Sequence, residues 1–379
     1  MTSARGFHIL FAIHLLITSI ALFNKSSAMT ANRLFATVKP LFTEVRIPSH
    51  SVSIVRYSNP IIFIGSCFSE NISSMLSKRK FRVMSNPQGI SFNPISISNT
   101  IRRCSNRQQF DVDDLFRDHL DGDIFHSWQH GREYSGTNET EVLKRMNSDL
   151  MKGYEYLRTA SAVFVTLGTS FAYKRKSGRD DKDNVVSNCH KQPASLFEKI
   201  TISPEIAVKE LIESFETLRE INPECEVVIT VSPIRHTREG ISQNSYSKAL
   251  LIAAAHQLCS QLDYVSYFPS YEIMMDELRD YRFYADDLIH PSNTAQEHVF
   301  EKFCDAYMSK KDLKMMRKVE SINKDMAHRP IVTDCLAYKR HLQACIVKLK
   351  TLDKEMEPSG INLNKEIDEC EGRLLRLSV

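Results

Sequence analysis

Four short runs of apolar, largely β-branched residues recur along the chain, and each ends in a small polar cluster. Such runs are typical of buried strands in a parallel sheet, because helices cover both faces of those strands. The runs occupy residues 60–64, 161–167, 225–231 and 264–268, and the polar clusters after them are Gly-Ser, Gly-Thr-Ser, Ser-Pro and Pro-Ser. Four strands of this kind limit the chain to an α/β architecture.

Helical patterns lie between and after these runs. The spacing of apolar residues predicts helices over residues 69–79, 203–221, 242–262 and 294–310. Strands that alternate with helices predict a doubly wound α/β sandwich, in which ligands gather at the carboxyl ends of the strands. We therefore expect the polar clusters to share one edge of the sheet, within a domain that covers residues 45–310.

Two regions depart from the alternation. Residues 101–150 are polar and hold the only tryptophan, Trp128, so they are interpreted as an insertion that is either a lid or a passive surface excursion. Residues 311–379 are rich in Lys, Glu and Leu at helical spacing, which predicts a helical C-terminal extension without chemistry of its own.

The N-terminal segment has the pattern of a targeting signal. Arg5 precedes an apolar run over residues 7–23, and small residues lead to Ala28, which is typical of a secretory signal; an uncleaved anchor is the alternative. Residues 29–44 form a linker or an organelle transit segment. We expect the secretory pathway or the extracellular space, with a plastid or mitochondrion as the alternative. We expect no stable membrane insertion after signal removal.

Composition and motif content limit the classes of partner and cofactor that we expect. Lysine and arginine total 49 against 46 acidic residues, and no basic stripe carries interleaved aromatics, so no nucleic-acid partner is expected. The nine cysteines show no CxxC pair, which argues against zinc or a disulfide scaffold, although one or two disulfides stay open. His126 and His130 are spaced as metal ligands can be, but they lack an acidic or Cys partner in the pattern. We expect no metal and no cofactor.

Ser66 follows the first apolar run through Gly65 and precedes a helical pattern. A serine at a strand-to-helix turn lies near backbone N–H groups and the positive end of the helix, where it can act as a nucleophile with its own amide as an oxyanion donor. A helix-capping serine occupies the same position. The local sequence leaves both interpretations open.

A second motif lies near the end of the domain, where Asp287 precedes His290 by three residues and Pro291 follows. On a short loop this spacing allows the carboxylate to orient the imidazole Nδ1–H while Nε2 faces a serine. In isolation the pair is more typical of a surface carboxylate and a histidine that caps a helix. The order of serine early and Asp-x-x-His late favours the catalytic interpretation.

Several segments resemble one known family. Residues 64–69 (Ile-Gly-Ser-Cys-Phe-Ser) resemble the signature of the GSCFA domain family, with Ser69 where the family name has alanine. Six further segments resemble it in the same order, at residues 86–94, 166–169, 186–191, 230–236, 267–272 and 287–292. The family is similar to SGNH (GDSL-type) hydrolases. The resemblance therefore implies a three-layer α/β/α sandwich with a parallel, flavodoxin-like sheet, and ester hydrolysis or acyl transfer, often on carbohydrates.

The resemblance also implies roles for individual residues. Ser66 would be the nucleophile, His290 the general base and then the acid, and Asp287 its orienting partner. The amides of Ser66 and Gly89 would form part of the oxyanion hole.

The third donor of the oxyanion hole departs from the wider pattern. SGNH proteins usually have an asparagine after the next strand, and residues 168–170 (Gly-Thr-Ser) contain none. Thr169, Ser170 or Asn188 would have to substitute. Losing such a donor costs on the order of 100-fold in rate, so the departure implies either a rewired hole or reduced hydrolytic power.

Further polar and aromatic residues are candidates for substrate binding, although each has a structural alternative, such as tying two loops together or anchoring a lid. These candidates are Asn188, His190, Ser232, Arg235, His236 and Trp128. The sequence thus predicts a serine esterase or O-acyltransferase that acts on ester-linked acyl groups, with an acylated glycan or another ester as substrate. The alternative is a catalytically weak carbohydrate-binding or scaffold protein that retains the fold.

Overall fold

The computed structural model describes residues 43–48, 53–118, 122–176, 184–331 and 335–377. Contacts divide the chain into Met1–Glu44 and Val45–Val379, and the second unit is described here. The predicted signal and residues 29–42 of the linker lie outside the described residues. Within the described ranges, no helix has the length and apolarity needed to cross a membrane.

The core of the unit is a five-stranded sheet in the order β10-β9-β5-β1-β2, with every neighbouring pair parallel. Its strands are β1 Ile61–Gly65, β2 Val83–Ser85, β5 Ala162–Leu167, β9 Glu226–Val231 and β10 Val265–Phe268. The four predicted strands are confirmed. The sequence missed β2, because this edge strand is only three residues long and half-buried, so it lacks an apolar run.

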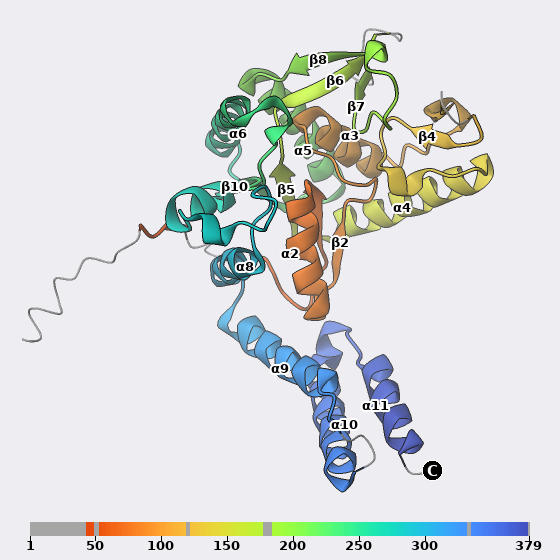
Figure 1. The fold of residues 1–379 in the computed structure, drawn as a ribbon, viewed down its shortest axis with the longest axis vertical. Helices are drawn as coiled ribbons and strands as arrows, with labels where there is room; N and C mark the ends of the chain where they lie inside the picture. Colours follow the sequence, from red (N-terminus) through yellow and green to blue (C-terminus); the bar gives the residue numbers. More distant parts are fainter. Residues whose placement is uncertain (1–42, 49–52, 119–121, 177–183, 332–334, 378–379) are drawn as a thin grey trace, which may run out of the picture. The chain divides into compact units, whose positions relative to one another are not determined.

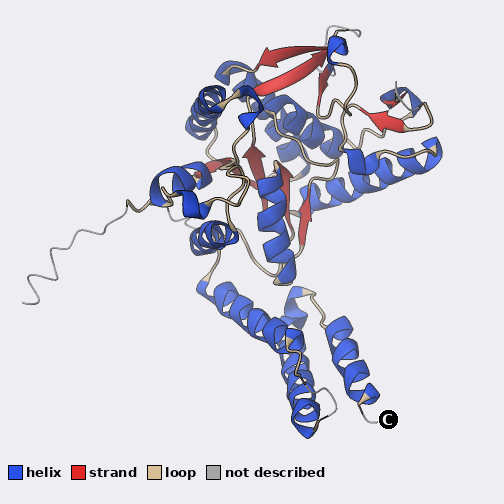
Figure 2. Cartoon of the chain, viewed as in Figure 1, coloured by secondary structure: helices blue, strands red, loops and turns tan. Residues whose placement is uncertain are grey.

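Helices cover both faces of the sheet (Figure 2). On one face, Ile61 and Phe63 of β1 pack with apolar residues of α2 and α8. On the other face, Ile62 and Ile64 pack with α3, α4, α5 and α6. These helices are α2 Cys67–Lys78, α3 Pro94–Ser105, α4 Glu139–Thr159, α5 Pro204–Ile221, α6 Ile241–Gln261 and α8 Asn293–Tyr307. The predicted three-layer α/β/α sandwich is confirmed.

Helix boundaries follow local capping. Ser292 caps α8, whose last residue is Tyr307, and Ser309 caps the next helix, α9 (Lys310–Ala327). The sequence had predicted a single helix over residues 294–310. A serine that accepts N–H groups from the turn after it starts a new helix, which explains the earlier end.

The predicted insertion at residues 101–150 is largely helical at both ends. It takes in the end of α3 and the first half of α4, whose buried stripe includes Val142, Met146 and Leu150. The charged outer face of α4 hid this stripe in the sequence. Between the helices lie the short antiparallel strands β3 (Leu115–Arg117) and β4 (Phe125–Ser127).

A second, smaller sheet follows β5 and was not predicted. It consists of β6 (Phe171–Arg175), β7 (Val185–Val186) and β8 (Phe197–Thr201), paired in the antiparallel order β7-β6-β8. Figure 1 shows these three strands together near α3, which contacts β7.

The C-terminal extension is helical, as predicted. After α9 it contains α10 (Leu336–Met356) and α11 (Asn364–Arg376), which pack against each other. Arg79 at the end of α2 bonds Glu320 of α9 at 2.5 Å, which joins the extension to the sandwich. All nine cysteines are free thiols.

Candidate active site

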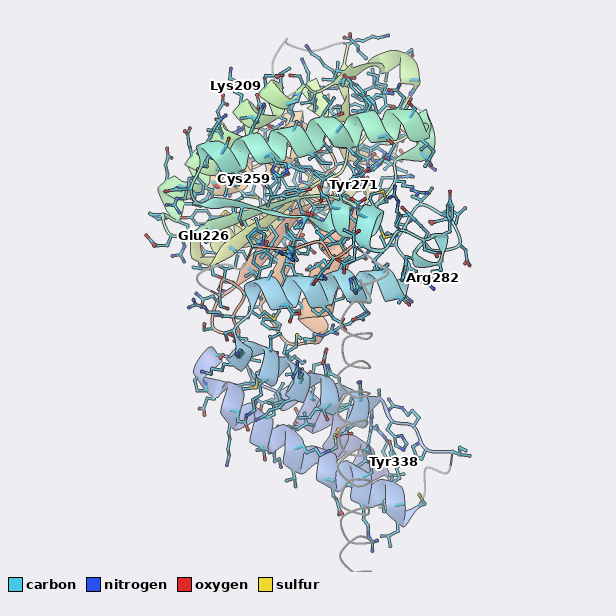
Figure 3. All side chains as sticks on the ribbon, turned by 90° about the vertical axis from the view of Figure 1, so that its left-hand side faces the viewer. Lys209, Glu226, Cys259, Tyr271, Arg282 and Tyr338 are labelled. Carbon is cyan, nitrogen blue, oxygen red and sulfur yellow. The ribbon has the colours of Figure 1, made fainter. Side chains whose placement is uncertain are left out.

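The carboxyl ends of the parallel strands bring the predicted residues to one edge of the sheet. Gly65 pairs with Thr166, and Thr166 pairs with Thr230, so β1, β5 and β9 end side by side. Figure 3 shows Glu226, at the start of β9, on the side opposite Tyr271 and Arg282, which belong to segments beyond the strand ends. The polar clusters therefore share one edge, as the alternation of elements predicted.

Ser66 lies at the turn from β1 into α2 and is only 1% exposed. Its Oγ accepts the N–H of Phe68 at 3.3 Å, so it is the N-cap of α2. Its own N–H donates to the Thr166 carbonyl at 3.3 Å. The serine thus stands at the positive end of a helix, the position that both the capping and the nucleophile interpretation required.

Gly65 is held on both sides by the segment that follows β2. Its N–H donates to Asn86 Oδ1 at 2.8 Å, and its carbonyl accepts the N–H of Ser91 at 3.1 Å. Asn86 has a positive φ of 46°, a conformation that asparagine tolerates better than most residues, and its Nδ2 donates to Glu70 Oε1 at 3.3 Å. Asn86 therefore sets the path of the chain into Ser66. In the sequence, residues 86–94 resemble the family and Gly89 is a predicted oxyanion donor, but no role was predicted for Asn86.

Asp287 organises the loop that carries His290. Its Oδ1 accepts the N–H groups of Ile289 and His290 at 2.9 and 3.0 Å, and its Oδ2 lies 2.7 Å from His290 Nδ1. These bonds hold the pKa of the Asp287 carboxyl down at about 2, with the backbone N–H of His290 as the largest contribution. An ionised carboxylate at Nδ1 fixes the tautomer that leaves Nε2 free to accept a proton.

The His290 loop is tied to the strand edge through the segment after β9. The Arg235 N–H donates to the Ile289 carbonyl at 3.2 Å, and its guanidinium lies 4.0 Å from the Tyr284 ring centroid. Arg235 therefore joins two loops, the structural alternative considered for it. The described residues show no hydrogen bond between Ser66 and His290, whose side chain is 47% exposed.

A buried lysine underlies the same edge. Lys248 of α6 is 1% exposed, and its Nζ donates to the carbonyls of Gly168 and Ser232, each at 2.7 Å. Burial lowers the pKa of Lys248 to about 7, because the charged form loses water. This amine joins the loops after β5 and β9. In the sequence, the signal that could have revealed this buried amine is a lysine among the apolar residues of α6.

The predicted oxyanion donors are already engaged. The N–H groups of Gly89, Thr169 and Ser170 donate to Asn86 O, Phe92 O and Ser247 Oγ, at 2.8, 3.0 and 2.8 Å. With the Ser66 bond to Thr166, all four N–H groups have partners within the protein. The oxyanion hole stays a prediction, and forming it from these groups requires some of those bonds to open.

The candidate substrate-binding residues divide into two groups. Asn188, His190 and His236 line a cavity of about 540 Å³ beside the small sheet. Ser232 is fully buried and supports the turn after β9 through its Oγ, and Arg235 bridges loops as described. The first group shares the larger space, and Arg235 lines a separate cavity of about 350 Å³.

Trp128 anchors the β3–β4 hairpin. Its ring stacks on Phe116 with centroids 3.5 Å apart, and Phe197 meets it edge-on at 5.6 Å. One ring face is therefore already covered. Of the two interpretations of Trp128, these contacts favour the structural anchor over substrate binding.

The histidines around Ser127 bond protein groups, although Nε2 of His130 is buried without a partner. His126 bonds Ser135 Oγ and Asp118 Oδ2 at 2.6 and 3.0 Å, and His130 Nδ1 lies 3.0 Å from Ser127 Oγ. Burial lowers the pKa of His130 to about 3. Within the described ranges, no group of three or more His, Cys, Asp or Glu is arranged to hold a metal ion.

A larger cavity of about 650 Å³ lies elsewhere, between the end of α2, α8 and α9. Charged side chains such as Arg79 and Glu320 line it and pair with each other. It contains none of the predicted catalytic residues.

Fold and site together define a class of protein: an α/β/α sandwich with a serine at its first strand-to-helix turn and an Asp-x-x-His pair on the loop before α8. The chain belongs to the GSCFA family. The GSCFA family model matches residues 60–303, and that of the GSCFA domain protein C-terminal domain matches residues 319–376. The resemblance seen in the sequence is thereby confirmed.

The comparisons with curated proteins and with solved structures add little to this family assignment. No curated protein matches this chain. Among solved structures, it is similar to an acetyl xylan esterase from the rumen bacterium Butyrivibrio proteoclasticus, with 13% identity and a TM-score of 0.32. That match covers 69% of this chain and 64% of the esterase chain, so this chain spans less than two thirds of that structure.

Proposed function

We propose that the protein is an SGNH-like serine esterase or O-acyltransferase, with Ser66 as nucleophile, His290 as general base and Asp287 as its orienting partner. The observation that carries the proposal is the Asp287–His290 geometry: a 2.7 Å bond to Nδ1 with Nε2 free of any described protein partner. A base held in this way is what an unactivated hydroxyl needs.

The reaction would proceed in two steps. Ser66 Oγ attacks the acyl carbonyl while its proton passes to His290 Nε2, and the alcohol leaves with that proton, which gives an acyl-enzyme. Water or another hydroxyl then attacks the acyl carbonyl, and His290 accepts its proton. The bond between the acyl carbon and Ser66 Oγ breaks, the acid or new ester leaves, and His290 returns the proton to Ser66 Oγ. The negative charge of each tetrahedral intermediate would lie near the first turn of α2, where the helix dipole favours an anion.

Catalysis in this arrangement requires a local rearrangement. Ser66 Oγ must release the Phe68 N–H, and the loop of His290 must bring Nε2 within reach. The hydrogen bond from Phe68 N–H to Ser66 Oγ is long at 3.3 Å, so breaking it costs little free energy.

We further propose an acylated glycan as the substrate, and a secretory or organellar destination directed by residues 1–28. Sequencing the mature N-terminus tests that destination.

A second candidate function has its own support. The engagement of all four predicted oxyanion N–H groups and the burial of Ser66 favour a protein that keeps the fold and binds a glycan without efficient turnover. In that case Ser66 serves only as the cap of α2.

Covalent labelling with a fluorophosphonate probe separates the two candidates. The wild type should be labelled, whereas Ser66→Ala and His290→Ala should lose labelling. Ser203→Ala is the matched control for the serine, because Ser203 caps α5 through Ile206 N–H but follows no strand of the five-stranded sheet. His298→Ala is the control for the histidine, because His298 also pairs with a carboxylate, Glu277, at 2.6 Å.

Both controls should be labelled like the wild type. A folded wild type that stays unlabelled, or a Ser66→Ala variant that labels normally, removes the nucleophile assignment and leaves the binding function. Release of acetate from acetylated oligosaccharides then measures turnover directly.

A further inference from the structure

The cavity lined by His190 and His236 adjoins the proposed active site, and we name it the His190–His236 pocket. Its volume of about 540 Å³ is typical of a small-molecule site. Phe92 and Thr169, two of its lining residues, are joined by the 3.0 Å bond from Thr169 N–H to Phe92 O. Ser91, the neighbour of Phe92, bonds Gly65, so the pocket wall is continuous with the turn that holds Ser66.

Two imidazoles in this wall have a buried ring nitrogen without a protein partner. His190 is 2% exposed, and its Nε2 lies 2.8 Å from the Ser127 carbonyl, so Nε2 carries the proton and donates. Its Nδ1 is buried and has no partner. His236 Nε2 is likewise buried and unpartnered.

Both imidazoles are neutral at physiological pH. Burial lowers the pKa of His190 to about 4. Burial, followed by the charges of Lys248 and His290, lowers the pKa of His236 to about 4. A neutral imidazole with an open nitrogen is an acceptor or donor for a hydroxyl group. Buried polar atoms are rarely left unpaired, so these nitrogens would gain a partner if a small opening of the pocket wall exposed them to a ligand hydroxyl or to ordered water.

The rim of the pocket carries positive charge. Lys191 and Arg238 line it, are exposed, and have no ion-pair partner among the described residues. Glu239, the one acidic residue among the described lining residues, is already paired with Lys199 at 2.7 Å. The described part of the rim therefore offers two uncompensated cations to a ligand.

Aromatic rings form part of the remaining walls. Phe92, Phe171 and Tyr173 line the pocket and are half-buried, so parts of their rings are accessible. Apolar ring faces beside hydroxyl-binding imidazoles suit a sugar ring, whose two faces are C–H-rich and whose edge carries hydroxyls. The two cations add a preference for negative charge.

We propose that the His190–His236 pocket binds an acidic sugar of the substrate glycan, with its hydroxyls at the two imidazoles and its anionic group toward Lys191 and Arg238. The inference rests on the proposed ester chemistry for the role of the bound sugar, which would carry the acyl group or accept it. Binding itself does not depend on that chemistry and can be measured without turnover.

Calorimetry with the full-length Ser66→Ala variant tests the inference, because no acyl transfer can occur. A galacturonic acid trimer should bind on the order of ten-fold more tightly than a galactose trimer at low salt, and the difference should shrink at high salt. A sulfated galactose trimer shows whether the anion is a carboxylate or a sulfate ester.

Two sets of variants locate the binding. Lys191→Gln combined with Arg238→Gln should bring the acidic trimer to the affinity of the neutral one. Lys152→Gln combined with Arg158→Gln makes the same charge change on α4, outside the pocket, and should have no effect. His236→Phe keeps a ring against Phe92 and should weaken binding of both trimers.

The outcomes separate this inference from the proposed function. Equal binding of acidic and neutral trimers, or an unchanged preference in the Lys191 and Arg238 variant, overturns the inference even if the wild type labels with fluorophosphonate. Binding of the acidic trimer by a wild type that never labels supports the pocket and removes the catalytic proposal.

Discussion

Asn86 Oδ1 accepts the N–H of Gly65 at 2.8 Å, and this bond fixes the residue that directly precedes Ser66. The partner residues lie 21 positions apart in the chain and meet because β1 and β2 are neighbours in the sheet. The turn that holds Ser66 is therefore shaped by a side chain that directly follows the adjacent strand as much as by its own sequence.

Asn86→Gly should lower stability by about 1 kcal/mol and slow fluorophosphonate labelling, because it removes the bonds to Gly65 and Glu70 while tolerating the positive φ. Asn86→Ala should cost about 1–2 kcal/mol more, because it adds backbone strain. Urea unfolding measures both. Equal stability of the two variants would contradict the role assigned to the backbone conformation.

Gly65→Ala should prevent folding or destabilise the protein by more than about 3 kcal/mol. A Cβ at Gly65 would lie 2.2 Å from the Thr166 carbonyl oxygen, in a conformation with φ of 139°. Gly240→Ala is the control, because Gly240 also has a positive φ, 88°, but no atom within 4 Å of a new Cβ. Soluble yield and thermal unfolding of the two variants should distinguish the steric clash at Gly65 from the backbone strain of a positive φ alone.

Asp287→Asn should retain the loop and lose most activity. The amide oxygen can still accept the N–H groups of Ile289 and His290, but the amide Nδ2 presents a donor to Nδ1 and stabilises the wrong tautomer. We expect labelling to slow by on the order of 100- to 10,000-fold.

The titration of Asp287 at acid pH tests the same hydrogen bonds. The folded pKa of Asp287 is about 2, below its ordinary value of 3.8, so the contribution of the ionised carboxylate is complete above pH 3.8 and is lost only as pH falls toward 2. NMR of the Asp287 carboxyl carbon should show titration near the lower value. Titration near 3.8 would contradict the hydrogen bonding described for the loop.

Lys248→Met should destabilise the protein by roughly 1–3 kcal/mol for each carbonyl left unpaired at Gly168 and Ser232. It should also change the dependence of stability on pH. Because the folded pKa of Lys248 is about 7 and the ordinary value is 10.5, the unfolded chain binds more protons between these values. Wild-type stability should therefore gain between pH 7 and pH 10.5 relative to Lys248→Met, as urea unfolding over this range can show.

Much of the fold follows from local patterns in the sequence. The apolar runs identified β1, β5, β9 and β10, since a strand buried on both faces needs continuous apolar residues. Short or amphipathic elements were not predicted. Strand β2 has only three residues, and the polar face of α4 concealed its stripe of apolar residues. The small sheet β7-β6-β8 depends on pairing between distant segments, which no local period encodes.

The sequence by itself determined that a serine follows the first strand and that a carboxylate and a histidine share a short loop, because spacing along the chain decides both. Only the tertiary structure decided which groups surround them. Asn86, Lys248 and Arg235 reach the site through sheet order and helix packing, and His190 meets His236 in one cavity although 46 positions separate them. Contacts between distant segments depend on how the elements pack, and local sequence does not specify that packing.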